Sequence, residues 1–172
     1  ENIVYSIAAA EKTGFPDNLF DCITVAQAYH WFDFPAFHRE VMRVARPGAI
    51  IAVWGYSLVV CEEENINTYI GSFYRDTVGP YWDKERKYVD EQYTTVPFPY
   101  EELPPGKFTI AVQWTKEDLQ GYFNTWSGVQ HFVRANGFNP VPEFFEKLHS
   151  TWADNKARMF YFPVFLRIGK VN

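Results

Sequence analysis

A histidine follows an apolar run near the start of this sequence. The run spans Phe20 to Ala26, and Gln27, His30 and Trp31 come shortly after it. An imidazole has a pKa near neutrality, so it can orient or deprotonate an acidic hydroxyl, or pair with a carboxylate when it is protonated. The alternative is that His30 is a structural histidine and that Trp31 forms part of a core wall.

The remaining histidines and the cysteines do not suggest a metal site. His38, His131 and His149 share no ligand spacing with one another or with the cysteines. Cys22 lies in one apolar run and Cys61 follows another, without the paired spacing of a disulfide scaffold or a zinc site. We therefore expect no metal, and a reducing, cytoplasmic setting.

The elements that would position His30 form a strand, a helix and a second strand. Phe20–Ala26 is almost continuously apolar, which is typical of a strand in a parallel sheet that helices cover on both faces. Asp33 can cap the helix, and Arg46-Pro47-Gly48 would stop it before a second buried strand at Ala49–Trp54. Apolar residues recur through the helix at Phe37, Val41, Val44 and Ala45. Parallel neighbours need such a crossover, so the pattern predicts an α/β fold.

The carboxyl ends of parallel strands border the ligand crevice of an open α/β sheet. This rule places Ala26, Gln27 and His30 at the crevice after the first of these strands, and Tyr56 after the second. A short strand at Ile3–Ile7 would come before them in the chain.

The second half of the chain predicts more helices and two strands. In order, we expect a helix that opens at Glu62, a proline-rich connection at Val96–Gly106, a strand at Phe108–Trp114, a helix from a capping box at Thr115 to Asn136-Gly137, a helix near Pro142 and a strand at Met159–Ile168. Pro163 lacks a backbone donor, so it predicts an edge or a bulge in the last strand. No linker divides the sequence, so we expect one domain.

The composition excludes several classes of protein. The chain has 172 residues, of which 47% are hydrophobic and 22% charged, as in a globular domain. Its net charge of −5 leaves no basic stripe for nucleic acid. The longest apolar stretch, Ala49–Cys61, is too short to span a membrane, and the N-terminus has no signal-peptide pattern. Aromatic residues make up 19%, which indicates a large core or an aromatic pocket, and the core is the simpler reading.

A series of short motifs resembles the middle of one enzyme family. In chain order they are Ala10-Glu11, Phe15-Pro16-Asp17, Phe20-Asp21, Ala28-Tyr29-His30-Trp31-Phe32-Asp33, Glu40, Arg43-Val44 and Arg46-Pro47-Gly48. Together they resemble the class I S-adenosylmethionine-dependent methyltransferases. The string from His30 to Asp33, and the later Thr115–Ser127 segment, resemble more narrowly the branch that includes trans-aconitate methyltransferase.

The resemblance implies a Rossmann-like sheet of seven strands in the order 3-2-1-4-5-7-6. Residues 1–61 would then hold strands 3 to 5, with Ile3–Ile7 as strand 3. Residues 62–106 would form a helical cap over the substrate, and residues 107–172 the C-terminal strands and helices. The glycine-rich turn of strand 1 would precede Glu1. Because the chain has no G-x-G motif, we expect a truncated methyltransferase that is inactive by itself.

The resemblance also implies a cofactor, S-adenosylmethionine, and the residues that contact it. Those four residues would be Ala10, Glu11, Ala26 and Gln27. His30 would be catalytic. A small-molecule substrate, one that carries a carboxylate, would contact Trp31, Tyr56 and Trp126. For Glu11 the alternative is a solvated surface carboxylate.

Two other functions stay open: a non-catalytic α/β module that binds a partner or itself, and another doubly wound enzyme that uses a nucleotide. The implied order places strand 1 beside Phe20–Ala26, so that strand would have an open edge in this chain. Open edges attract other strands. We therefore expect a homodimer through this edge, or pairing with the chain's own Ile3–Ile7.

Overall fold

The computed structural model describes residues 2–149, 151–152 and 156–172. These residues form two compact units. The first contains the chain up to Ser57, together with Lys87–Phe108 and Val164–Asn172, and the second contains Leu58–Arg86 and Thr109–Pro163. The segment 62–106, expected as one cap, is therefore divided between the two units after Arg86.

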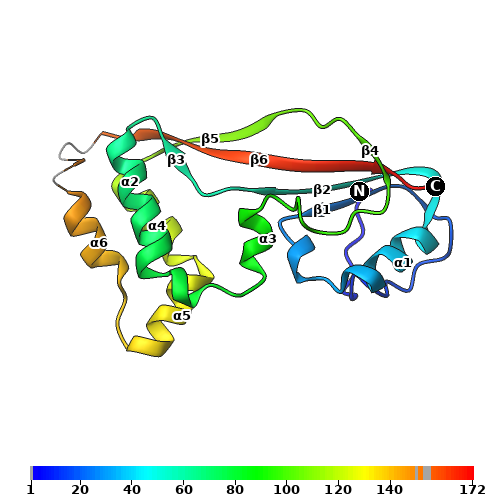
Figure 1. The fold of residues 1–172 in the computed structure, drawn as a ribbon, viewed down its shortest axis with the longest axis horizontal. Helices are drawn as coiled ribbons and strands as arrows, with labels where there is room; N and C mark the ends of the chain where they lie inside the picture. The colour runs from blue at the N-terminus through cyan, green and yellow to red at the C-terminus, as the bar shows by residue number, and fades with distance from the viewer. Residues whose placement is uncertain (1, 150, 153–155) are drawn as a thin grey trace. The chain divides into compact units, whose positions relative to one another are not determined.

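The first unit is built on the expected strand, helix and strand (Figure 1). Strand β1 (Phe20–Ala26) has the predicted bounds and pairs in parallel with β2 (Ala45–Tyr56). Helix α1 (Phe34–Val44) connects them, and its N-cap Asp33 accepts a hydrogen bond from the Ala36 amide at 2.9 Å. The prediction of a parallel α/β unit is confirmed.

Two expectations about the start of the chain are wrong. Ile3–Ile7 is not a strand, and its side chains are mostly solvent-exposed. Within the described chain β1 pairs only with β2, so its other edge is not filled by Ile3–Ile7. Of the seven residues of β1 only Val25 is buried, and among the described residues β2 is the one strand that pairs with it.

Strand β6 (Arg158–Lys170) has partner strands in both units. In the first unit it pairs with β2 and with β4 (Glu101–Leu103), and in the second with β3 (Val60–Cys61) and β5 (Phe108–Trp114).

Pro163 separates the part of β6 that pairs with β3 from the part that pairs with β2. The register with β3 includes Phe160 and Tyr161, and the register with β2 begins at Val164. The residue without a backbone donor lies between these two ladders, where it forfeits no bond of either.

The second unit is mainly helical. Its helices are α2 (Glu64–Ser72), a π turn η2 (Phe73–Thr77), a 3-10 turn η3 (Gly79–Tyr81), α4 (Lys116–Asn124), α5 (Ser127–Asn136) and α6 (Val141–Leu148), and the short α3 (Arg86–Asp90) lies at the boundary of the units. The capping box at Thr115 and the left-handed Gly137 at the end of α5 confirm the predicted helix limits.

The expected single helix from Thr115 to Asn136 is wrong, because the chain breaks between α4 and α5. The amides of Thr125 and Trp126 bond to the carbonyls three residues earlier, and Trp126 then takes an extended conformation. This break turns the Trp126 ring against Phe123, with ring centroids 4.1 Å apart. Burial of the indole therefore outweighs helical continuity.

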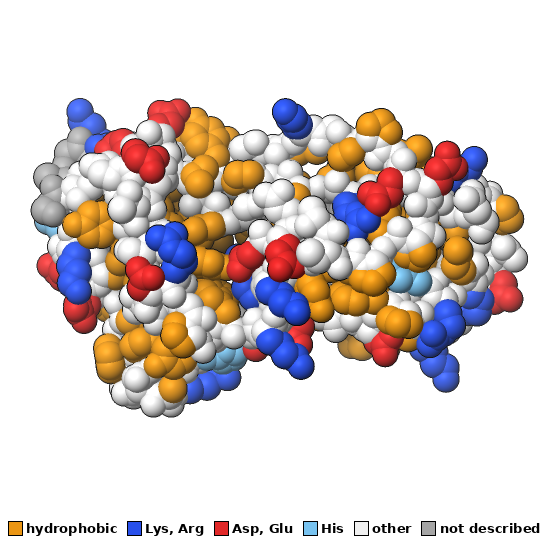
Figure 2. Space-filling model, in the orientation of Figure 1, with side chains coloured by type: hydrophobic (Ala, Val, Ile, Leu, Met, Phe, Trp, Pro, Cys, Tyr) orange, Lys and Arg blue, Asp and Glu red, His pale blue; other side chains and the backbone are white. Residues whose placement is uncertain are grey.

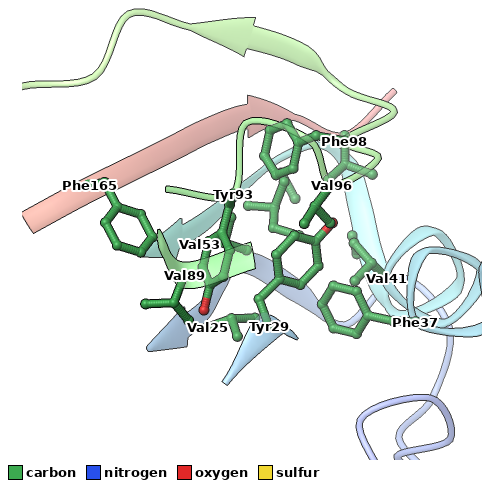
Figure 3. Packing of buried hydrophobic residues seen from close by; sticks show 14 residues of the cluster. Val25, Tyr29, Phe37, Val41, Val53, Val89, Tyr93, Val96, Phe98 and Phe165 are labelled. Carbon is green, nitrogen blue, oxygen red and sulfur yellow. The ribbon is translucent and has the colours of Figure 1, made fainter. Parts of the chain in front are cut away.

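The predicted aromatic core is present in both units. In the first, Tyr29, Phe37 and Tyr93 pack with aliphatic side chains of β1, β2 and α1 (Figure 3). In the second, the rings of Phe73, Trp126 and Phe144 each stack on that of Phe123. Charges of both signs are interspersed on the surface in view (Figure 2). Among the described residues, no helix combines the length and apolar character of a membrane span.

A buried polar chain crosses the core of the first unit. The Tyr29 hydroxyl donates to the Pro97 carbonyl at 2.6 Å and lies 2.8 Å from Nε2 of His38. Nδ1 of His38 lies 2.7 Å from the Tyr100 hydroxyl. Because the Tyr29 proton is used on Pro97, all four groups are satisfied when His38 carries its proton on Nε2 and accepts from Tyr100. Burial lowers the pKa of His38, which favours this neutral form.

A carboxylate holds the N-terminal loop against α1. Oε1 of Glu40 accepts hydrogen bonds from the amide and hydroxyl of Thr13 at 2.8 and 2.6 Å. Arg43 binds the same carboxylate and also reaches the Phe15 carbonyl and Asp17, each at 2.7 Å. Hydrogen bonds from Arg43, and then from Thr13, lower the pKa of Glu40 from its ordinary 4.5 to about 2.

This network predicts acid sensitivity. Between pH 4.5 and about 2, Glu40 becomes protonated in the unfolded chain while it stays ionised in the folded one. The contribution of Glu40 to the free energy of unfolding is therefore lost as the pH falls through that window. Glu40→Gln should lower the free energy of unfolding at pH 7 by about 1–2 kcal/mol and flatten its pH dependence in the window. Urea denaturation over a pH series measures both quantities.

The control is Glu143→Gln, which removes an exposed carboxylate from its ion pair with Lys147. Solvent screens that pair, so the change should be smaller. Equal pH profiles for the Glu40→Gln variant and the unaltered chain would contradict this account of the loop.

Candidate functional site

The chain turns sharply at the carboxyl end of β1. Gln27 has a φ of 52°, in the left-handed region that side chains other than glycine rarely adopt. Its amide donates to the Trp54 carbonyl at 2.8 Å, and its side-chain Oε1 accepts from the Tyr56 amide at 2.9 Å. Gln27 therefore ties the ends of β1 and β2 together. Strained backbone held by its surroundings is frequent at functional sites.

Gly55 makes room for this side chain. A Cβ at position 55 would lie 2.7 Å from Oε1 of Gln27 and would also overlap the ring of Phe165. Real Cβ atoms do not come so close to other heavy atoms. The Gln27 side chain can therefore cross β2 to the Tyr56 amide only because residue 55 has no Cβ.

The loop with Ala10 and Glu11 is folded onto the start of α1. A bridge joins Ala9 and Lys12, with the Lys12 amide donating to the Ala9 carbonyl at 3.0 Å. The Glu11 carboxylate accepts from the Asp33 amide at 3.0 Å. This bond links the loop to the N-cap residue of α1.

A cavity of about 400 Å³ lies beside β1. Its walls come from the N-terminal loop, β1 and α1, and the lining residues that matter here are Ala10, Thr13, Ala26, Ala28, Phe32 and Glu40. It brings together two of the four predicted cofactor residues, Ala10 and Ala26. The other two, Glu11 and Gln27, are chain neighbours of these lining residues but do not line the cavity themselves.

The lining is mostly apolar. Small side chains at Ala10, Ala26 and Ala28 leave width, and Phe32 offers an aromatic surface. No Lys or Arg is among the described lining residues, and the Glu40 carboxylate is occupied by Thr13 and Arg43.

His30 lies in the 3-10 turn η1 (Tyr29–Trp31), directly beyond the carboxyl end of β1. Its ring is 7% exposed, and Nδ1 lies 2.9 Å from the Tyr93 hydroxyl. The ring of Trp31, 55% exposed, lies beside it with centroids 4.8 Å apart. The predicted neighbourhood of Gln27, His30, Trp31 and Tyr56 thus falls on one edge of the first unit.

Trp126 belongs to the second unit, where it is 7% exposed and its ring packs against Tyr74, Trp82 and Phe123. Of the predicted substrate residues, Trp31 and Tyr56 therefore share a unit with His30, and Trp126 does not.

The sequence did not reveal two members of the site. Tyr93 follows a stretch without helical or strand periodicity, so no local signal indicates that it reaches His30. Thr13 follows the bridge residue Lys12, and only its distant partner Glu40 explains its place in the cavity wall. Among the residues that the structure covers, no group of three metal-binding side chains occurs.

Comparisons with known proteins identify a family. A family model described as a methyltransferase domain matches residues 1–53. A protein of Dictyostelium discoideum named as a methyltransferase is 32% identical over 176 residues, which cover 99% of this chain and 67% of the relative. A structure described as a type II methyltransferase of Anaeromyxobacter dehalogenans is 34% identical, with a TM-score of 0.88 over 98% of this chain and 72% of that one.

The matched family, the overall identity and the shared fold lead to one conclusion. Methyltransferases of this class use S-adenosylmethionine as their cofactor. The chain belongs to the class I S-adenosylmethionine-dependent methyltransferases.

Proposed function

We propose that this chain supports methyl transfer from S-adenosylmethionine to a small molecule that carries a carboxylate, with His30 on the substrate side. The observation that carries the proposal is the cavity at β1, which Ala10 and Ala26 line beside the turn that carries His30. Ligands of open α/β sheets bind outside the carboxyl ends of the strands, where this turn lies.

The cofactor supplies a methyl group that is already activated by the positive sulfur. The protein therefore mainly aligns the groups and excludes water. Ala10 and Ala26 would contact the adenine, while Gln27 would shape the edge nearer the ribose or the methionine part. His30 would orient or deprotonate an acidic hydroxyl, or pair with the substrate carboxylate when it is protonated.

The aromatic residues around His30 would complete the substrate side. Trp31 exposes more than half of its ring next to His30, and Tyr56 follows β2 at the same edge. We propose that both contact the substrate, and the substrate role of Trp126 stays a prediction. A trans-aconitate-like substrate, a cytoplasmic location and a homodimer through the open edge of β1 stay predictions.

The proposal makes cofactor binding depend on a glycine-rich turn that these 172 residues do not contain. Such a turn offers close backbone approach and a helix N-terminus to the polar end of a ligand. We propose that a full-length polypeptide with this turn binds S-adenosylmethionine in the micromolar range or tighter, and that the 172 residues alone bind it much more weakly and are inactive.

Calorimetric titration of the full-length polypeptide tests cofactor binding. Ala26→Leu should weaken binding about tenfold or more, because the larger side chain fills part of the cavity. Ala111→Leu is a matched control, since Ala111 is an exposed strand alanine of β5 in the other unit. No heat with either the cofactor or its demethylated product would refute the proposal, as would equal affinities of the two variants.

His30 is tested by turnover. His30→Asn should lower kcat about 100-fold and leave the affinity for the cofactor nearly unchanged, because only the transition state loses the interaction. His131→Asn is the control, because that histidine binds the Tyr81 carbonyl in the second unit. If His30→Asn turns over as fast as the unaltered protein, His30 returns to the structural interpretation.

A further inference from the structure

The position of His30 depends on a residue distant in the chain. The hydroxyl of Tyr93 lies 2.9 Å from Nδ1 of His30, and both side chains are buried, Tyr93 completely. A phenol hydroxyl both donates and accepts, so it can bond Nδ1 whether that atom carries the proton or not. The contact therefore fixes the plane of the imidazole without requiring one protonation state.

The backbone that presents Tyr93 is itself unusual. Gln92 and Tyr93 have φ values of 54° and 58°, two successive left-handed residues without a glycine. Such a conformation persists only where the surroundings impose it.

Arg167 of β6 supplies that constraint. Its guanidinium donates to the carbonyls of Tyr93 and Val96 at 2.9 and 2.7 Å. The same group pairs with Glu102 at 2.5 Å and lies over the ring of Phe98, 4.5 Å from its centroid. The turn before Val96 is thus anchored to the sheet of the first unit.

The ring of Tyr93 is held as firmly as its backbone. Its centroid lies 5.4 Å from that of Tyr29 and 5.0 Å from that of Phe165, both at nearly perpendicular angles (Figure 3). These edge-to-face contacts fix the position of the Tyr93 hydroxyl. Since Tyr29 precedes His30 in the same 3-10 turn, Tyr93 contacts that turn at two successive side chains.

We propose that Tyr93 is a positioning residue for His30, with Arg167 holding the turn that presents it. The inference rests on the proposed function of His30 and deepens it. The sheet places His30 at the edge of the site, and the 87–108 segment fixes the direction of its ring. Tyr93 acts through His30 and does not itself contact the substrate.

The test compares two variants that each remove one buried hydroxyl next to a histidine. Tyr93→Phe removes the partner of His30, and Tyr100→Phe removes the partner of His38 in the polar chain of the core. Tyr93→Phe should lower kcat about tenfold, with little change in KM for the cofactor, because a misdirected imidazole weakens only the transition state. Tyr100→Phe should leave kcat within twofold. Unfolding curves confirm that each variant is folded at the assay temperature.

A double-mutant cycle separates positioning from a general loss of packing. If Tyr93 acts through His30, Tyr93→Phe should change kcat by less than twofold once His30→Asn is present. The same tenfold loss in both backgrounds would overturn the proposal, because Tyr93 would then act by another route.

The ring nitrogens of His30 provide a readout that does not depend on activity. Nitrogen-15 spectra should show altered His30 signals in Tyr93→Phe and unaltered ones in Tyr100→Phe. Unaltered His30 signals in Tyr93→Phe would overturn the proposal. Altered signals in a protein that transfers no methyl group would instead refute the proposed function and, with it, the catalytic purpose of the contact.

Discussion

The parallel pairing of β1 with β2 is the constraint on which the site depends. The pair ends on one edge, where Gln27 leaves β1 in a left-handed turn and crosses to the Tyr56 amide of β2. The crossing is possible because Gly55 has no side chain to meet Gln27. The position of this edge determines where the predicted cofactor and substrate residues of the first unit lie.

Two sets of contacts fix the loops around that edge. Glu40 and Arg43 of α1 hold the loop that carries Ala10, and the hydrogen bond from the Tyr29 hydroxyl to the Pro97 carbonyl joins η1 to the 87–108 segment. Both sets use charged or polar groups whose partners are distant in the chain. The loops need such contacts because they have no ladder of backbone bonds of their own.

Local sequence patterns predicted most of the elements. Phe20–Ala26 and Phe108–Trp114 appear with the predicted bounds, and the signals at Asp33, Thr115 and Gly137 mark real helix ends. These signals are local, because a cap or a breaker acts within one turn of its own residue. Motif resemblance supplied the family, which the comparisons support.

The wrong and missing predictions concern long-range contacts. Ile3–Ile7 has strand propensity, but a strand exists only with a partner, and the described structure offers it none. The α4–α5 break depends on the aromatic neighbours of Trp126, which periodicity does not show. The same holds for Tyr93, whose role depends on Arg167 and His30. Local patterns describe elements, whereas the site is made where distant elements meet.

The central claim is that the Gln27 crossing over Gly55 shapes the cofactor edge, and Gly55→Ala in the full-length polypeptide tests it most directly. The added methyl should displace Gln27, lower the free energy of unfolding by about 1–3 kcal/mol and weaken S-adenosylmethionine binding about tenfold in calorimetry. Gly121→Ala, in an open position of α4, should bind the cofactor unchanged. If the Tyr56 amide of Gly55→Ala exchanges its hydrogen faster, yet the cofactor binds as tightly as before, the claim is contradicted.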